Sequence, residues 1–91
     1  MNERTSVLED ASSLINGQRQ SDYGTPAENF QCIADMWAAY LGREINPADV
    51  TNMMALLKIA RLRNGHLRNN YHRDSFVDGC GYLALGAELS G

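Results

Sequence analysis

Positive charge is concentrated in one short part of the chain. Five of the eight Lys and Arg side chains and both histidines fall between residues 58 and 73: Lys58, Arg61, Arg63, Arg68, Arg73, His66 and His72. An ammonium group binds phosphate as a point charge, whereas a guanidinium offers a planar fork that fits phosphate or carboxylate. We therefore expect an anion-binding site in or beside this segment.

Two carboxylates follow the cationic segment. Asp74 and Asp78 are four residues apart, so on a helix they share one side. Mg²⁺ is commonly held by one or two protein carboxylates together with phosphate oxygens of the bound molecule. The sequence therefore predicts a pocket in which Lys58 and Arg61 hold phosphate while Asp74 and Asp78 hold Mg²⁺.

Arg61 stands in an unusual place for a charged residue. The stretch DVTNMMALLKIARLRNG, residues 49–65, has the pattern of a helix, and Arg61 lies near the centre of an apolar face. The apolar members of that face are Val50, Met53, Met54, Leu57 and Ala60. A buried guanidinium must be paired, and Asp78 is the expected partner. Two interpretations stay open: a structural ion pair that orients two helices, or one wall of a polar ligand pocket.

The connection NGHLRNNYHRDS, residues 64–75, is rich in cations. It directs positive charge and a new helix N-terminus toward one point, which favours anion binding. Arg68, His72 and Arg73 are the side chains that we expect to close over a phosphate. The alternative is a solvated basic loop without a ligand. A zinc site is not indicated, because the histidines have no third soft ligand nearby in the sequence.

A second possible ligand corner precedes the helix that starts near residue 26. Arg19 and Tyr23 lie in the connection, and Asn29 lies close to the apolar stripe of the following helix. Tyr23 could stack on a base or pack against the protein. Glu28 and Asp35 share the opposite side of that helix, where a solvated face is the favoured interpretation over metal binding.

Helix start signals predict four helices. A polar N-cap residue followed three positions later by an acidic residue forms a capping box, and proline is favoured at the first helical position. The paired residues are Ser6 with Glu9, Thr25 with Glu28, Asn46 with Asp49 and, as a weaker case, Ser75 with Asp78. The predicted helices end near Gly17, Leu41, Gly65 and Leu89.

These signals place the chain in the all-α class. The predicted fold is a compact bundle of four short helices in a single helical domain, residues 1–91. The third and fourth helices carry apolar residues on more than one side, and such helices must be covered on more than one side. Four short helices cannot provide that cover, so we expect a homo-oligomer.

Composition restricts the environment and the partners. The formal charge of −3 argues against general nucleic-acid binding. The polar start MNERTSVLED is unlike a signal peptide, and no apolar run approaches the ~20 residues that span a bilayer. Cys32 and Cys80 fit no disulfide framework and are expected to be small buried hydrophobic residues in a reduced compartment. Together these features predict a cytoplasmic protein with no membrane partner.

Three stretches carry a resemblance to a known group. DYGTPAENFQCIADMWAAYLG (22–42), MMALLKIARLRNG (53–65) and HRDSFVDGCGYLALGAE (72–88) resemble a family of small, functionally uncharacterised phage and prophage proteins. More distantly, DYG, the Lys58 and Arg61 pair, and Asp74, Asp78 and Tyr82 are similar to the phage nucleotide-modification-associated domain. Through that domain the chain is faintly similar to MazG-like NTP pyrophosphohydrolases.

The distant resemblance implies helical oligomers that bind Mg²⁺ through an EExxE helix and a later ExxD helix. Carried over to this chain, only Asp78, and less securely Asp74, match the later acidic helix. The EExxE helix has no counterpart, because Glu28 and Asp35 have a different spacing. This departure puts nucleotide hydrolysis in doubt, since a two-metal site needs more converging carboxylates.

Three functions follow as hypotheses. The favoured one is a phage-type nucleotide-binding protein that sequesters a host signalling nucleotide in the host cytoplasm, with Tyr23 or Tyr71 near the base. The second is a Mg²⁺-dependent, MazG-like pyrophosphohydrolase. The third is a non-catalytic structural or interaction protein in which Arg61 and Asp78 only fix helix geometry.

Overall fold

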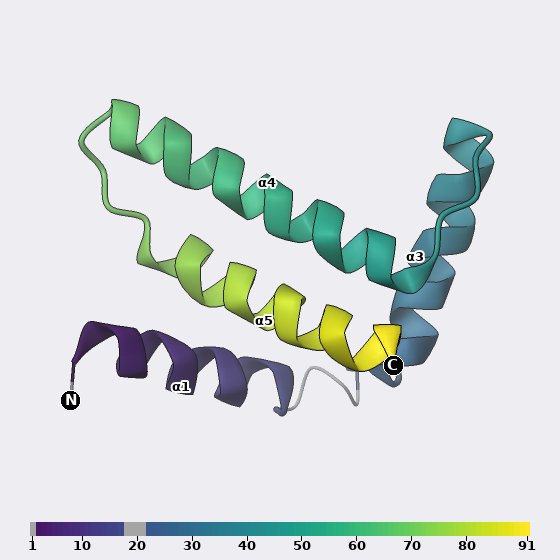
Figure 1. Cartoon of the computed structure of the whole chain (residues 1–91), viewed down its shortest axis with the longest axis horizontal. Coiled ribbons are helices and arrows are strands. Elements are labelled where there is room, and N and C mark those ends of the chain that lie inside the picture. Colours follow the sequence, from purple (N-terminus) through teal and green to yellow (C-terminus); the bar gives the residue numbers. More distant parts are fainter. Residues whose placement is uncertain (1, 18–21) are drawn as a thin grey trace.

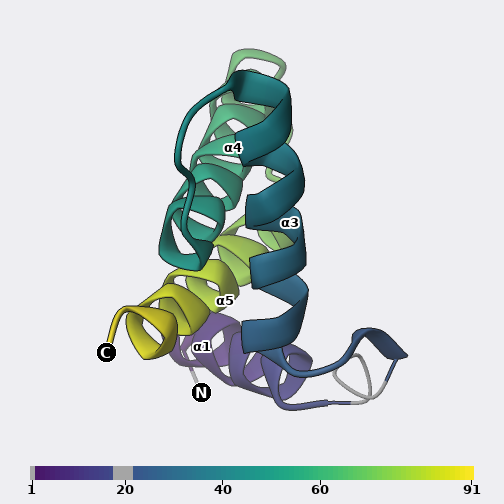
Figure 2. The same ribbon diagram turned by 90° about the vertical axis from the view of Figure 1, so that its right-hand side faces the viewer.

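Four α-helices make up most of the described part of the chain. The computed structural model describes residues 2–17 and 22–91. The helices are α1 (Glu3–Ile15), α3 (Pro26–Leu41), α4 (Pro47–Leu67) and α5 (Arg73–Ser90), and the described residues contain no strand. α4 and α5 run antiparallel, α1 packs on α5, and α3 crosses the end of the α4–α5 pair (Figures 1 and 2). The predicted all-α fold with four helices is confirmed.

Two of the predicted capping boxes are formed. The Oγ1 atom of Thr25 accepts a hydrogen bond from the Glu28 backbone N–H at 3.2 Å, and Glu28 accepts one from the Thr25 N–H at 3.3 Å. Asn46 and Asp49 exchange the same pair of bonds at 2.8 and 3.0 Å. Gly42 ends α3 in the left-handed conformation, with φ 69°, which glycine adopts without steric cost. Local sequence therefore sets three of these helix ends.

The other two predicted boxes are wrong. α1 begins earlier, at Glu3, because the side chain of Asn2 accepts a hydrogen bond from the Thr5 N–H at 2.9 Å. Ser6 consequently lies inside the helix. α5 begins at Arg73, so Ser75 lies within its first turn, and no side-chain cap is formed there. The Ser6 hydroxyl accepts a hydrogen bond from Arg73 across the molecule, and the Ser75 hydroxyl is bound to the ring of His72, the N-cap residue of the same helix.

The core consists of two small clusters. Val7, Ala11 and Val77 join α1 to α5, with the half-buried Cys80 packed against them. Phe30, Ala34 and Val50 join α3 to α4, and the partly buried side chains around them are Ile33, Trp37, Ile45, Met54, Tyr82, Leu85 and Leu89. Cys32 is exposed, so the prediction that it is buried is wrong: it lies on the outer side of α3.

α4 and α5 approach each other through small residues. Thr51 on α4 is fully buried, and its hydroxyl donates a hydrogen bond to the Ala48 carbonyl oxygen at 2.8 Å. A Cβ atom added at Gly86 on α5 would lie only 2.5 Å from Thr51 Oγ1. The absence of a side chain at Gly86 therefore permits this helix contact.

This contact determines which face of α4 is buried. The face toward α5 carries Thr51, Ala55, Lys58 and Leu62. Of the face that was predicted to be buried, Val50 and Met54 pack against the core cluster on α3, whereas Met53, Leu57, Ala60 and Arg61 are exposed. Both faces carry apolar residues, so periodicity alone does not distinguish them. The small side chains of Thr51 and Ala55 fit the glycine-rich surface of α5. The prediction that Arg61 is buried is therefore wrong.

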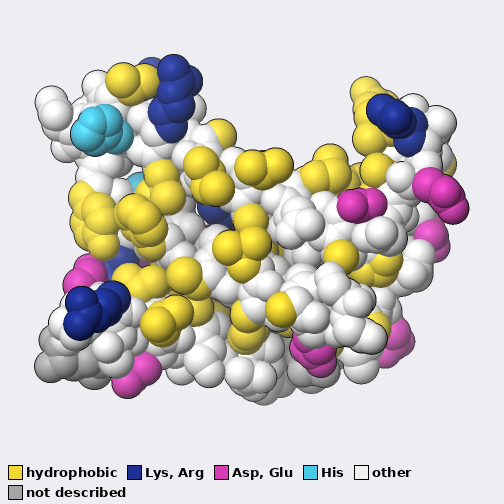
Figure 3. Space-filling view, viewed as in Figure 1, with side chains coloured by type: hydrophobic (Ala, Val, Ile, Leu, Met, Phe, Trp, Pro, Cys, Tyr) yellow, Lys and Arg dark blue, Asp and Glu magenta, His cyan; other side chains and the backbone are white. Residues whose placement is uncertain are grey.

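Many large apolar side chains stay exposed in the single chain. On α4 they include Met53 (39 % exposed), Leu56 (63 %) and Ile59 (56 %). Figure 3 shows hydrophobic side chains across the middle of one face of the molecule. The expected homo-oligomer would cover such side chains and stays a prediction. Within residues 2–17 and 22–91, no helix is long and apolar enough to cross a membrane.

Candidate functional site

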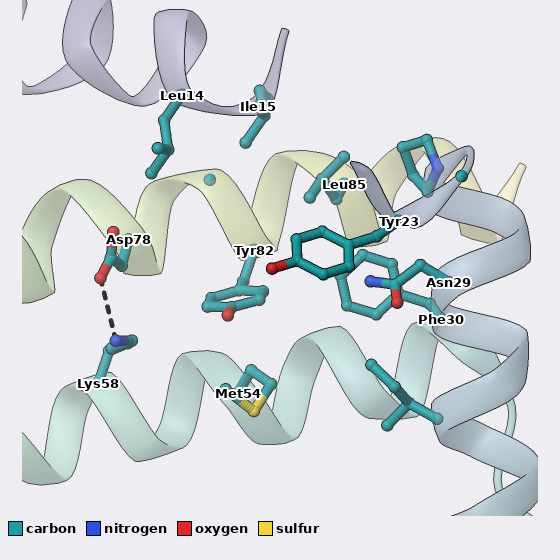
Figure 4. Close-up of a pocket in the computed structure, with 14 residues that line it drawn as sticks. Leu14, Ile15, Tyr23, Asn29, Phe30, Met54, Lys58, Asp78, Tyr82 and Leu85 are labelled. Atoms are coloured by element: carbon teal, nitrogen blue, oxygen red, sulfur yellow. Dashed lines mark ion pairs between the residues drawn. The ribbon is translucent and has the colours of Figure 1, made fainter. Parts of the chain in front are cut away.

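A cavity of about 270 Å³ lies where α3, α4 and α5 meet the end of α1. Its wall combines aromatic rings, one amide and one ion pair (Figure 4). The residues that give it this character are Tyr23, Asn29, Phe30, Tyr82, Lys58 and Asp78. Lys58, Asp78, Tyr23 and Asn29 are four of the predicted site residues, so the fold brings these four to one place.

The polar end of the cavity is an ion pair between α4 and α5. Lys58 Nζ lies 3.0 Å from Asp78 Oδ2, and the two side chains are 12 % and 29 % exposed. Lys58 takes this position because it lies on the buried face of α4. The predicted pair between Arg61 and Asp78 is therefore wrong, since Arg61 points to solvent one turn farther along the helix.

The other end of the cavity is aromatic. Phe30 and Tyr82 pack edge to face, with ring centroids 6.3 Å apart and an interplanar angle of 76°. Figure 4 shows Tyr23 and Asn29 beside them, and Tyr82 between this group and the Lys58–Asp78 pair. Tyr23 is 63 % exposed. This end offers flat apolar surface next to a side-chain amide.

The turn that presents Tyr23 depends on one glycine. Gly24 has φ 84°, a conformation that side chains with a Cβ rarely adopt. It is followed at once by the Thr25 cap of α3. The turn and the cap together place Tyr23 and Asn29 on the same side of the cavity. Arg19, which was predicted in the same corner, lies outside the described residues.

The remaining predicted cations lie elsewhere. Arg61, Arg68 and His72 line a second cavity at the C-terminal end of α4. Arg73 faces α1, where its Nη2 atom lies 2.8 Å from Asp10 and its Nε atom 3.5 Å from Glu3. The predicted phosphate site is thus divided among three places along α4 and α5.

Arg73 holds the N-terminal helix against α5. Besides the two carboxylates, its guanidinium donates a hydrogen bond to Ser6 Oγ at 2.9 Å. Tyr71 donates a hydrogen bond to Glu3 Oε2 at 3.0 Å, so it does not face the cavity that contains Tyr23. The hydrogen bond to Asp10 raises the pKa of the Arg73 guanidinium further above its usual range. These contacts assign Arg73 and Tyr71 to helix docking.

We expect Glu3→Gln to lower the pKa of Tyr71. The hydrogen bond to Glu3 and, after it, burial raise that pKa above 10.0, because ionising the phenol breaks the bond and puts two negative charges together. A raised pKa in the folded state gives stability that is present below pH 10 and lost as the pH rises through the folded value. An ultraviolet titration should show one tyrosine shifting in Glu3→Gln. Identical titration curves for the unmodified protein and Glu3→Gln would contradict the hydrogen bond between Tyr71 and Glu3.

Metal ligands are sparse in the described ranges. Residues 2–17 and 22–91 contain no group of three or more His, Cys, Asp or Glu side chains that could hold a metal ion. Asp78 is paired with Lys58, and Asp74 is exposed on the first turn of α5. Glu28 and Asp35 are also exposed, as predicted, and are used in a cap and in a hydrogen bond from Gln31 at 2.9 Å. A Mg²⁺ ion here would need ligand oxygens from a bound phosphate.

Sequence reasoning missed Phe30, Met54 and Tyr82 as walls of the cavity. The signal that could have found them is their sequence neighbourhood: Phe30 follows Asn29 directly, Met54 precedes Lys58 by one turn, and Tyr82 follows Asp78 by one turn. Met54 and Tyr82 therefore share a helix face with Lys58 and Asp78, and Phe30 is adjacent to Asn29 in the chain. These neighbours can be assigned to a cavity only when it is known which side of α4 faces α5.

Comparison with known proteins identifies phage relatives. The chain is 49 % identical over 77 residues to the Gene 55 protein of Mycobacterium phage D29 and 50 % identical over 81 residues to that of Mycobacterium phage L5. These matches cover 85 and 88 % of this chain but only 48 and 49 % of the relatives, so the chain spans about half their length. No solved structure matches.

A family model agrees with these relatives. The model described as "Domain of unknown function (DUF6378)" matches residues 6–90, which contain the cavity and the contacts of Arg73 with Ser6 and Asp10. The expected resemblance to an uncharacterised phage protein family is thereby confirmed, while the similarity to MazG-like enzymes stays a prediction. The chain belongs to the DUF6378 family.

Proposed function

We propose that this protein binds a mononucleotide in the cavity between α3, α4 and α5. The observation that carries the proposal is the division of that cavity into two ends. Tyr23, Phe30 and Asn29 form an aromatic and amide end, and Lys58 with Asp78 forms a charged end. A nucleotide has the same division into a flat base with polar edges and a charged phosphate.

The aromatic end suits a nucleobase. Stacking of a base on an aromatic side chain is worth about 1–3 kcal/mol by alanine substitution. Tyr23, at 63 % exposure, has ring surface left to cover. Asn29 has an amide with both donors and an acceptor, and it lies next to Tyr23 in Figure 4. In the proposed complex the base stacks on Tyr23 and its edge bonds to Asn29.

The charged end suits a phosphate. An ammonium group has three donors, and the salt bridge to Asp78 at 3.0 Å uses one of them. Asp78 therefore orients Lys58 and leaves donors for a phosphate oxygen. If the nucleotide brings Mg²⁺, Asp78 would hold the ion together with phosphate oxygens, because this ion usually binds one or two carboxylates plus phosphate oxygens; Asp74 lies one turn away on α5.

The size of the cavity favours a small ligand. Its volume of about 270 Å³ is slightly below the ~300 Å³ at which typical small-molecule sites begin. A base and sugar would fill most of it, with the phosphate at the end formed by Lys58 and Asp78. This argues for a mononucleotide instead of a dinucleotide.

Binding without turnover is favoured over hydrolysis. Among the described residues that line the cavity, Asp78 is the only carboxylate, and Lys58 already pairs with it. A two-metal phosphohydrolase needs several converging carboxylates. We therefore propose that a phage protein of this kind lowers the free concentration of a host nucleotide by holding it, in the host cytoplasm.

A thermal-shift screen tests the proposal. Purified protein is mixed with ribonucleotides and deoxyribonucleotides, with and without Mg²⁺, and each mixture is then analysed by chromatography. A ligand at 100 times its dissociation constant adds about 2.7 kcal/mol, which raises Tm by roughly 10 °C or more in a domain of this size. Recovery of the intact nucleotide supports binding. Release of pyrophosphate would support the hydrolase, and no shift would contradict nucleotide binding.

Lys58→Gln should weaken the binding of the best nucleotide by roughly tenfold or more, because it removes a charged hydrogen bond worth about 1.5–3 kcal/mol. Arg63→Gln is the matched control: Arg63 is also on α4 but is exposed and does not line the cavity. Calorimetric titration measures both dissociation constants. Equal weakening in the two variants would mean that general charge, and not the cavity, attracts the nucleotide.

A further inference from the structure

The second cavity lies at the junction of α4 and α5. Its volume is about 240 Å³, and it is lined by Arg61, Asn64, Gly65, Arg68, Asn70 and His72. The set contains two guanidinium groups, one imidazole and two amides, and no acidic residue. Every one of these side chains can donate a hydrogen bond, which is the composition expected around an oxyanion.

The backbone holds this cavity in a defined shape. The N–H of Asn70 donates to the Gly65 carbonyl oxygen at 2.8 Å, and the N–H of Asn69 donates to that of His66 at 3.1 Å. These two bonds, with Asn69 at φ 56°, form a Schellman motif at the end of α4. A Cβ atom at Gly65 would lie 2.7 Å from the Asn70 carbonyl oxygen. The connection therefore folds back tightly against α4, and it keeps Arg68 and His72 near Arg61.

The two arginines of this cavity form no ion pair with an Asp or Glu of the described residues. Of the ion pairs within residues 2–17 and 22–91, none involves Arg61 or Arg68, whereas Arg73 binds both Glu3 and Asp10. The only hydrogen bond from the Arg68 side chain in that part of the chain is a long one, 3.4 Å, to the Asn64 carbonyl oxygen. Two guanidinium forks thus converge on one cavity without an anionic partner.

α5 adds a further attraction for negative charge. Its N-cap residue is His72, and the helix begins there without a side-chain cap. The positive end of the helix dipole favours an anion at such a start. His72 Nδ1 is held by Ser75 Oγ at 2.6 Å, which fixes the ring and leaves Nε2 for another partner.

We propose that this cavity is a second, independent site that binds a tetrahedral oxyanion, namely a phosphate group. The planar guanidinium groups of Arg61 and Arg68 donate hydrogen bonds to its oxygens, and His72 and the N-terminus of α5 complete the contacts. The phosphate comes either from free inorganic phosphate or from a small phosphate monoester. The site does not depend on the nucleotide cavity, because the two share no lining residue.

An NMR titration with inorganic phosphate tests the site on the ¹⁵N-labelled full chain. We expect saturable shifts of the Arg61, Arg68 and Asn70 signals. Arg61→Gln should weaken phosphate binding at least about fivefold, and Arg68→Gln likewise, since each removes a charged hydrogen bond. Arg63→Gln, which makes the same change of charge on the same helix outside the cavity, should change it less than about twofold.

The same titration with glycerol 3-phosphate distinguishes the two sources. Tighter binding than inorganic phosphate would identify a monoester as the ligand, and weaker binding would identify free phosphate; the site stands in both cases. In both titrations Lys58→Gln should leave the shifts of the Arg61, Arg68 and Asn70 signals unchanged, because Lys58 does not line the second cavity, so a failed nucleotide cavity would not affect this test. Linear shifts without saturation, or equal weakening by Arg63→Gln and Arg61→Gln, would overturn the proposal and leave a solvated basic loop. Circular dichroism confirms that each variant is folded.

Discussion

Gly86→Ala is expected to destabilise the protein by about 2–3 kcal/mol, the upper part of the range for overpacking a close contact. The added Cβ would lie 2.5 Å from Thr51 Oγ1 and 3.4 Å from Thr51 Cβ. Thr51 cannot move aside easily, because it is fully buried and its hydroxyl is bound to the Ala48 carbonyl oxygen. The helices α4 and α5 must therefore separate. Urea denaturation followed by circular dichroism measures the loss.

Two variants make this prediction specific. Gly79→Ala is the matched control on the same helix: its Cβ would meet only Lys58 Cβ at 3.9 Å, so the change should stabilise α5 by about 0.5–1 kcal/mol through helix propensity. Thr51→Ala combined with Gly86→Ala should recover part of the lost stability, because the closest atom is then gone. Equal effects of Gly86→Ala and Gly79→Ala would show that the two helices are not in close contact at Gly86.

Phe30→Ala is expected to cost about 3–5 kcal/mol, as for other buried aromatic residues. Phe30 is 6 % exposed and is one of three buried residues that join α3 to α4. It also packs edge to face with Tyr82, so its loss opens the cavity wall. A domain of this size has a total stability of only about 5–14 kcal/mol, and the variant should lose much of it.

The same truncation elsewhere provides the control for Phe30. Phe76 is 44 % exposed on α5 and contacts the ring of Tyr71 at a centroid distance of 5.9 Å. Phe76→Ala should cost about 1–2 kcal/mol, because nearly half of the side chain is already exposed and its loss leaves no enclosed void. Thermal or urea unfolding compares the two. A larger loss for Phe76→Ala than for Phe30→Ala would contradict the position of the core.

Local signals in the sequence predicted the helical class and two helix starts. The Thr25 and Asn46 boxes each combine an N-cap, a proline and an acidic third residue, and such cooperating signals need no tertiary information. Ser6 and Ser75 have the same spacing to an acidic residue but are used differently. Ser6 binds Arg73 from across the molecule, and Ser75 binds the ring of His72. Spacing alone does not predict such competing partners.

The candidate site was predicted only in part, for one physical reason. α4 has apolar residues on two faces, and the close approach of Thr51 to Gly86 selects the one that packs on α5. That choice rotates Lys58 toward Asp78 and Arg61 toward solvent. Lys58 and Arg61, which were predicted to hold one phosphate together, therefore line two different cavities. Asp78 was correctly predicted to form an ion pair with α4, but its partner is Lys58, one helical turn before the predicted Arg61.

The most direct test of nucleotide binding is an NMR titration of the ¹⁵N-labelled protein with the nucleotide that raises Tm most. The account predicts saturable shifts of the Asn29 side-chain amide and of the backbone amides of Gly24 and Tyr82, which surround the cavity. Asn29→Ala should weaken this binding, whereas Gln31→Ala, an exposed amide on the same helix, should not. Shifts confined to the second cavity, around Arg61 and Asn70, or no saturable shift with any nucleotide, would contradict it.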